Sequence, residues 1–384
     1  MTRTRTRSCP PQHYKIVRFW DLVWSCPPAE SMVIIIKMKL FSRRDFLKYS
    51  SAALAAGIFL PDPSLLLNSA TLENGRVATD QVSVYAQADD TSTIIRQLFR
   101  DEIFTIYEDV ISEKGPGYNP LWHRVWGGYV HSARIQKVET RLNQPLSSVP
   151  ETGLLTEITV PYTQAYRYTK TYGWMPIYRL YYGSTHWIIG VEEGPDGQPW
   201  YRIRDELLAA RHENYHAPAQ HMRYIQPEEY SPLSTNVALE DKLIEVDIAT
   251  QTLTAYEGGT EVLHTKISSG LPSITVNNKN TDTDTPRGEF SVFRKTPSKH
   301  MGGGYFTDDL DAYILPGVPW ASFFVENGVA FHGTWWHNNF GMTMSHGCVN
   351  MRTAEALWIY RWTLPVCEPN TVETNGRGTR VVVR

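Results

Sequence analysis

The alternation of hydrophobic and polar residues along this chain indicates a protein built mainly from β-strands. Short runs of Val, Ile, Thr and Tyr alternate with polar residues, and they outnumber long stretches with helical periodicity. The clearest example is KLIEVDIATQTLTAYEGGTEVLHTKISSG, residues 242–270, where the alternation continues on both sides of an EGGT turn. This pattern predicts a β-hairpin with Leu243, Val246, Leu253 and Ala255 as inward-facing residues.

Downstream of the hairpin, turn signals alternate with short apolar segments. TPRGEFSVF, residues 285–293, predicts a strand after a tight turn set by Pro286 and Gly288. The stretch at residues 301–324 is rich in glycine and aromatic residues, and its three consecutive glycines disfavour a regular strand. We therefore expect a mobile flap there, which leads into a strand from Trp320 to Val325.

A helix is predicted near the C-terminus. The segment TAEALWIYRW runs from Thr353 to Trp362, directly after the last predicted β-segment. Thr353 is a suitable cap for this helix, and Glu355 suits its first turn. These patterns predict a β-rich C-terminal domain, residues 238–384, with one helix close to its end.

The middle of the chain contains a repeat. QVSVYAQ at residues 81–87 is similar to EITVPYTQ at residues 157–164, and LWHRVWGGYVHSARIQKVE at residues 121–139 is echoed by segments at residues 199–205 and 215–229. Such spacing indicates duplication of a unit of about 75 residues. We expect two small β-barrel domains, and GGYVHSARI resembles the closing segment of bacterial SH3-like barrels. Their predicted bounds are residues 77–140 and 150–232.

The aromatic residues of this repeat allow two interpretations. Tyr85, Trp122, Tyr162, Trp174 and Trp200 either bind glycan or peptide in a groove or fill the cores of the two barrels. The second interpretation is the more common role of such residues in small β-barrels.

The N-terminus carries a candidate export signal. SRRDFLKYSSAALAAGIFLPDPSLLL, residues 42–67, places two arginines ahead of a weakly apolar run that is too short and interrupted to be a good spanning helix. It resembles a twin-arginine signal, so we expect residues 38–70 to direct export to the cell envelope, with membrane contact only through this signal. Residues 1–37 are basic and aperiodic, and we interpret them as a non-native or disordered extension.

Composition excludes some functions and raises a question about the cysteines. The chain has 384 residues with 42% hydrophobic and 20% charged residues, which is typical of a folded protein. Its net charge of −3 gives no global basic field, so nucleic acid is not an expected partner. Cys9 and Cys26 fall in the N-terminal extension, which leaves Cys348 and Cys367. A disulfide between these two would exclude Cys348 as a nucleophile.

The stretch FHGTWWHNNFGMTMSHGCVN, residues 331–350, concentrates reactive side chains. His332, His337, His346 and Cys348 offer four possible metal ligands, but the paired spacings of structural zinc sites and the glutamate of a catalytic H-x-E site are absent. We therefore predict no metal and no cofactor. An inert structural thiol is the second interpretation, and nucleophilic catalysis is the third.

The SHGC segment favours the third interpretation. A thiol that follows glycine, and that lies just ahead of a helix, sits where backbone amides can stabilise negative charge. His332 lies sixteen residues before Cys348, close enough for a loop or hairpin to bring it back as a base. Backbone amides around Gly347 and Cys348 are candidate donors to an oxyanion, each typically worth ~3 kcal/mol. A thiol nucleophile, a histidine base and oxyanion donors are together the groups that acyl transfer requires.

The same residues carry a family resemblance. FHGT and MSHGCVN, with TPRGEF upstream, closely resemble the motif of the L,D-transpeptidase catalytic domain, a β-sandwich with a helix after the nucleophile. The resemblance implies the following roles: Cys348 as nucleophile, His332 as general base and acid, the Gly333 carbonyl as its orienting group, and His346 and Gly347 as lining and oxyanion-hole residues. It further implies Met301, Tyr305, Trp320, Asn350 and Arg352 as substrate-binding residues. No role follows for Trp335, Trp336 and His337.

The resemblance also implies a reaction. Cys348 would attack a peptidoglycan tetrapeptide stem, release the terminal D-alanine and form a thioester, which the amine of a second stem resolves as a 3→3 cross-link. Water as acceptor would make the protein an L,D-carboxypeptidase, and a protein lysine would anchor a lipoprotein. The family also reacts with carbapenems at its cysteine. A non-catalytic wall-binding protein, which uses the two SH3-like domains for glycan, is the alternative of another class.

Overall fold

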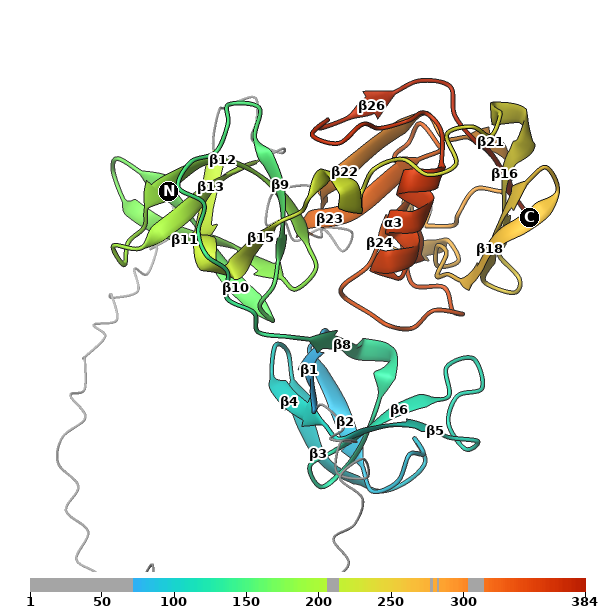
Figure 1. Cartoon of the computed structure of the whole chain (residues 1–384). Coiled ribbons are helices and arrows are strands. Elements are labelled where there is room, and N and C mark those ends of the chain that lie inside the picture. Colours follow the sequence, from blue (N-terminus) through green and yellow to red (C-terminus); the bar gives the residue numbers. More distant parts are fainter. Residues whose placement is uncertain (1–71, 206–213, 277–278, 282, 303–313) are drawn as a thin grey trace, which may run out of the picture. The chain divides into compact units, whose positions relative to one another are not determined.

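The structure is a computed structural model (Figure 1). It describes residues 72–205, 214–276, 279–281, 283–302 and 314–384, and these fall in a compact unit spanning Ala70–Arg384. The predictions for the N-terminal extension, for the export signal and for Tyr305 lie outside the described residues. None of the helices in the described ranges has the length and apolar character needed to cross a membrane.

The first β-module, residues 73–138, consists of two small antiparallel sheets. One has the order β4-β1-β8 and the other the order β3-β2-β7-β6-β5. Alternate residues of these strands face a common core, which includes Val84, Leu98 and Val130. The strands are β1 (Glu73–Val77), β2 (Gln81–Tyr85), β3 (Ile94–Phe99), β4 (Ile103–Ile106), β5 (Glu108–Ile111), β6 (Leu121–Val125), β7 (Gly128–His131) and β8 (Ile135–Val138).

The second β-module, residues 154–224, is a seven-stranded antiparallel sheet of order β11-β10-β14-β13-β12-β9-β15. Its core contains Leu180, Ile188 and Ile203, all fully buried. The strands are β9 (Leu154–Ile158), β10 (Tyr162–Thr169), β11 (Gly173–Tyr181), β12 (Thr185–Glu193), β13 (Pro199–Arg204), β14 (Asn214–Pro218) and β15 (Met222–Tyr224).

The two modules end in the same way. In each, a strand is followed by a 3-10 turn, Ser132–Arg134 or Ala219–His221, and then by a closing strand. That closing strand pairs antiparallel with the first strand of its own module, β8 with β1 and β15 with β9. Trp122 and Trp200 are both buried, so these two aromatic residues fill cores, whereas Tyr162 is exposed. The assignment of the modules as SH3-like stays a prediction.

The C-terminal domain, residues 242–383, contains two five-stranded sheets and a helix, α3 (Thr353–Trp362). The sheet orders are β18-β17-β16-β27-β21 and β25-β24-β23-β22-β26, and β19 and β20 form a separate hairpin. The strands are β16 (Lys242–Asp247), β17 (Thr252–Glu257), β18 (Thr260–Lys266), β19 (Ile274–Val276), β20 (Lys279–Thr281), β21 (Gly288–Ser291), β22 (Arg294–Gly302), β23 (Ile314–Phe323), β24 (Ala330–Gly333), β25 (Val349–Met351), β26 (Thr374–Asn375) and β27 (Arg380–Val383). The prediction of a mainly β protein is confirmed.

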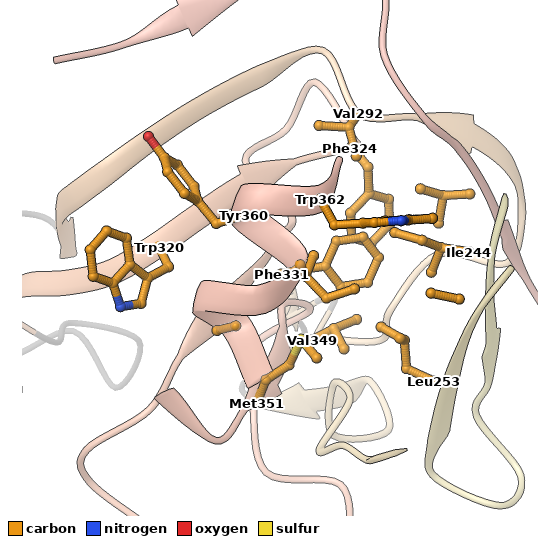
Figure 2. Packing of buried hydrophobic residues seen from close by; sticks show 14 of the residues in the cluster. Ile244, Leu253, Val292, Trp320, Phe324, Phe331, Val349, Met351, Tyr360 and Trp362 are labelled. Carbon is orange, nitrogen blue, oxygen red and sulfur yellow. The ribbon is translucent and has the colours of Figure 1, made fainter. Parts of the chain in front are cut away.

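Both sheets and the helix bury one shared core, which fixes the strands that carry the reactive segment. Ile244 and Leu253 come from the first sheet, Phe331 and Val349 from the second, and Trp362 from α3. Figure 2 shows Trp362 and Phe331 on the side of α3 that faces Ile244 and Leu253. Burial of each such side chain contributes about 1.5–3 kcal/mol. Because β24 and β25 lie within this core, their positions are set rigidly.

Two details of the predicted hairpin needed correction. The EGGT turn joins β17 to β18, and β16 precedes them as a third antiparallel strand. Leu243 is only half-buried, whereas Ile244 and Val246 face the core. Side chains alternate between faces along a strand, so Leu243 and Val246, three positions apart, cannot share one. Lys242 takes the corresponding place on the buried face, where its Nζ donates to the Trp362 carbonyl at 2.8 Å.

The helix boundaries were predicted correctly, but the cap was not. Thr353 is the first helical residue, and the capping position belongs to Arg352, which makes no side-chain capping bond. Glu355 lies in the first turn as expected. The strand predicted from Trp320 to Val325 starts earlier, at Ile314, and ends at Phe323, because β23 forms a long antiparallel pair with β22. Part of the predicted flap is therefore regular sheet.

Candidate active site

Cys348 lies at the start of a strand in the second sheet. Cys348 immediately precedes β25, which pairs in parallel with β24 so that His332 lies opposite Asn350. The segment that connects His332 to Cys348 therefore starts and ends at two neighbouring, hydrogen-bonded strands. An antiparallel bridge from Ser268 to Asn350 holds the other edge of β25. This parallel pairing explains why His332 and Cys348, which are sixteen residues apart in sequence, line the same cavity.

The loop before Cys348 is fixed by Thr285, the first residue of the TPRGEF motif. The Thr285 hydroxyl donates to the Gly347 carbonyl and accepts from the Gly270 N–H, each at 2.8 Å. Gly347 has a φ of +110°, a conformation that side chains other than hydrogen disfavour. Its N–H donates to the Ser345 hydroxyl at 3.2 Å, so this amide is already engaged within the loop. The sequence predicts this amide as an oxyanion donor, but in this structure the Ser345 hydroxyl accepts its hydrogen bond.

A cavity of about 380 Å³ opens at Cys348. Its volume is within the usual range for a ligand-binding pocket. Five residues singled out from the sequence line it together: Met301, His332, His346, Cys348 and Asn350.

Two predicted substrate-binding residues lie elsewhere. Trp320 is buried in the hydrophobic core, with its ring 5.5 Å from that of Tyr360 on α3. Arg352 is exposed and forms an ion pair with Glu355 at 3.2 Å. Both line a second cavity of about 480 Å³, on the other side of Trp335, and neither lines the cavity at Cys348. Their predicted contact with substrate at the reactive centre has no support in this arrangement.

His332 is held in the orientation expected of a base. Its Nδ1 lies 3.0 Å from the carbonyl oxygen of Gly333, to which Nδ1–H donates, so Nε2 is the basic nitrogen of the neutral ring. Burial lowers the pKa of His332 to about 4, and the hydrogen bond to Gly333 opposes this shift only in part. The imidazole is therefore neutral, and able to accept a proton, throughout the neutral pH range.

The Cys348 thiol is half-buried and not oxidised. Cys348 and Cys367 are both free, and Cys367 is buried in the core, where its sulfur accepts a hydrogen bond from the Thr374 hydroxyl at 3.3 Å. The disulfide that would have excluded a nucleophile is absent from the described residues. Burial raises the pKa of Cys348 to about 11. The resting pair is a neutral thiol and a neutral imidazole, so proton transfer must accompany attack on the substrate.

This protonation state predicts a distinctive pH dependence of alkylation. Only the thiolate reacts, so the rate of Cys348 modification by iodoacetamide should rise about tenfold per pH unit between pH 7 and pH 10. A free cysteine with an ordinary pKa would level off near pH 9. Peptide mass spectrometry, with Cys367→Ser as background, measures the rate at Cys348 alone. A plateau below pH 8 would show instead a thiolate already stabilised by a protonated His332.

His337, for which the sequence assigned no role, positions Asn350. The His337 Nδ1 accepts from the Asn339 N–H at 3.2 Å, so the proton of the neutral ring is on Nε2. The structure places Nδ2 of Asn350 2.9 Å from Nε2, where two protonated nitrogens would face each other. A 180° rotation of the Asn350 amide puts its oxygen there instead and gives that otherwise unpartnered buried oxygen a donor. Burial, aided by nearby Arg134, lowers the pKa of His337 to about 3, so the ring stays neutral. His337 therefore holds the side chain of Asn350, which lines the cavity.

The remaining wall of the cavity comes from residues that the sequence did not identify. Trp335 stacks on Tyr181 of the second module, with ring centres 4.4 Å apart, and its carbonyl accepts from Arg76 of β1 at 3.4 Å. The Arg76 guanidinium also lies 4.2 Å from the centre of the Tyr181 ring. Asp101 pairs with Arg76 at 2.8 Å and also contacts Arg179 of β11. Apart from Trp335, these residues lie outside any local motif, and only tertiary contacts bring them to the cavity.

The C-terminal domain matches a known protein family. Residues 241–383 match the family model YkuD, the L,D-transpeptidase catalytic domain. Residues 241–383 are an L,D-transpeptidase catalytic domain. The match includes both sheets, α3 and the Cys348 segment, and it confirms the resemblance seen in the sequence. A search of curated proteins gave no match.

Solved L,D-transpeptidases are similar to parts of this chain. The enzyme of Xylanimonas cellulosilytica is 25% identical over 37% of this chain and 60% of its own, with a TM-score of 0.28. That of Enterococcus faecium is 26% identical over 38% and 50%, with a TM-score of 0.28. That of Mycobacterium smegmatis is 20% identical over 48% and 90%, with a TM-score of 0.30. The chain thus covers less than two thirds of the first two.

Proposed function

We propose that the protein is an L,D-transpeptidase that forms 3→3 cross-links between tetrapeptide stems of peptidoglycan. The observation that carries this proposal is the shared cavity of Cys348 and His332, with Nδ1 of His332 fixed by the Gly333 carbonyl. A thiol and a neutral, oriented imidazole that line one cavity support acyl transfer. Within the proposal, the terminal D-alanine is the leaving group and Cys348 becomes the acyl carrier.

The first half-reaction follows from the neutral pair. As Cys348 Sγ attacks the carbonyl carbon of the scissile amide, His332 Nε2 takes the thiol proton, and the same proton passes to the departing amine nitrogen of D-alanine. The carbonyl oxygen carries the developing negative charge. Backbone N–H groups near Cys348 are the candidate donors to it, each removal typically costing ~3 kcal/mol. A thioester on Cys348 remains.

The second half-reaction determines the product. The amine of a second stem attacks the thioester, His332 receives a proton from that amine, and the Cys348 thiol is regenerated as a 3→3 cross-link forms. Water as acceptor gives a tripeptide stem, and a protein lysine gives an anchored lipoprotein. His346 is exposed at the cavity, where it is well placed to contact an incoming acceptor.

The remaining expectations are part of the same proposal. We propose export by the twin-arginine route to the cell envelope, on the strength of residues 42–67. The two β-modules are proposed as SH3-like domains of a wall enzyme, with glycan as a candidate ligand. Tyr168 and Tyr172, both exposed on the β10–β11 hairpin, and Trp126 of the first module are among the exposed aromatic residues available for such a contact.

Muropeptide analysis tests the proposed reaction. Purified protein is incubated with sacculi rich in tetrapeptide stems, and the digest is analysed by mass spectrometry. We expect new dimers joined 3→3, with one D-alanine released per bond formed. Tripeptide monomers without dimers would assign the carboxypeptidase reaction. Unchanged muropeptides, from protein whose Cys348 still alkylates, would favour the non-catalytic wall-binding protein.

A further inference from the structure

The cavity at Cys348 is positively charged on the side built by the first β-module. Among the described residues that line it are Arg76, Arg100 and Arg134, all from this module, and none is Asp or Glu. Low-dielectric walls with charge of one sign concentrate ligands of the opposite sign. The electrostatics of the cavity therefore favour a negatively charged group on the bound molecule.

Two of the three arginines are already neutralised. Arg76 is buried and pairs with Asp101 at 2.8 Å, and Arg100 pairs with Asp80 at 2.6 Å. Arg134 has neither an ion pair nor a side-chain hydrogen bond to any described residue. Partial burial lowers its pKa without a carboxylate to offset the shift, yet a guanidinium stays protonated at neutral pH. Arg134 is thus the unneutralised charge of this wall.

Arg134 is held against the catalytic segment by its neighbours. It ends the 3-10 turn Ser132–Arg134, and the adjacent Ala133 carbonyl accepts from the Asn338 N–H at 2.8 Å. The Asn338 carbonyl in turn accepts from the Asn119 side chain at 3.2 Å. Arg134 also contributes to the lowered pKa of His337. Its position relative to the reactive loop is therefore set by backbone hydrogen bonds.

The chemistry of the proposed substrate supplies a matching anion. In a tetrapeptide stem, the residue that leaves is the last, so its C-terminal carboxylate is only three bonds from the attacked carbonyl carbon. When that carbonyl lies at Cys348 Sγ, the carboxylate lies within the same cavity. We infer that Arg134 binds the C-terminal carboxylate of the leaving residue, so that the first β-module completes the donor site. This inference rests on the proposed function and assigns a specificity determinant that lies outside the catalytic domain.

A pair of peptides tests the inference. D-Alanine or D-alaninamide release is measured with a tetrapeptide stem that ends in a free carboxylate and with the same stem as a C-terminal carboxamide. A charge-assisted hydrogen bond predicts a ~10- to 100-fold loss of kcat/KM for Arg134→Gln on the carboxylate peptide. On the carboxamide peptide, Arg134→Gln and the parent protein should agree within about twofold. Arg134→Lys should recover part of the loss, because it retains the charge.

Controls distinguish a failure of the Arg134 carboxylate site from a failure of the proposed function. Arg96→Gln removes an exposed arginine of the same module that does not line the cavity, and it should leave both rates unchanged. Equal losses on the two peptides, or no loss on either, would overturn the role of Arg134 while Cys348-dependent turnover still upheld the reaction. A parent protein that does not prefer the carboxylate peptide would overturn it too. An inactive parent protein whose Cys348 still alkylates would instead count against the proposed reaction.

Discussion

Replacement of Cys348 by serine is expected to abolish covalent reaction with a carbapenem. The parent protein should gain the mass of one inhibitor molecule, because the thiol is the group that would attack the strained lactam. A serine hydroxyl beside His332 lacks the third group that activates such hydroxyls, since the partner of the imidazole is only the Gly333 carbonyl. We expect the rate of adduct formation to fall by at least ~10³-fold. Intact-protein mass spectrometry measures it directly.

The chain offers a matched control for this experiment. Cys367 is the second free cysteine of the described residues, but it is buried in the core beside α3 and lines neither of the cavities described above. Cys367→Ser should therefore form the adduct at the parent rate, with the modification mapped to the peptide that contains Cys348. An adduct that persists in Cys348→Ser would place the reactive group elsewhere and contradict the assignment of the nucleophile.

Local signals in the sequence predicted the C-terminal helix and directed attention to the Cys348 segment. The helix from Thr353 to Trp362 was found because its composition and first-turn acid are short-range features. Cys348 and His332 were found because the glycine-flanked motif is itself short-range. The structure adds what the motif could not contain, namely the parallel pairing of β24 with β25 and the Thr285 bonds that fix the loop.

Long-range packing was the part that the sequence did not reveal. Trp320 follows a glycine-rich, aromatic stretch and was predicted to bind substrate, but it packs against Tyr230 and Tyr360 in the core. Nothing in its immediate neighbours distinguishes a core tryptophan from one that covers a substrate. Likewise, no feature of the sequence singles out Arg134. Its place at the cavity depends on contacts with a segment some 200 residues away.

A second large effect is expected from Asp101→Asn, which leaves the shape of the side chain but removes its charge. Asp101 pairs with Arg76 of the first module and contacts Arg179 of the second, and the side chains of Asp101 and Arg76 are 4% and 2% exposed. Loss of one partner from a buried pair typically costs about 3–5 kcal/mol, because the remaining charge is left unpaired. We expect the free energy of unfolding, measured with urea, to fall by this amount.

Glu108→Gln is the matched control, because its pair with Arg124 lies in the same module at 3.1 Å but is 45–60% exposed. Such surface pairs contribute at most about 1 kcal/mol, so the two variants should differ clearly. Asp101→Asn should also disturb the wall of the cavity at Cys348. Arg76 donates to the Trp335 carbonyl and lies over the Tyr181 ring, and Trp335 stacks on that ring. Protein that stays folded should therefore react more slowly at Cys348. Equal stability of the two variants would mean that the buried pair does not hold the first module against the catalytic domain.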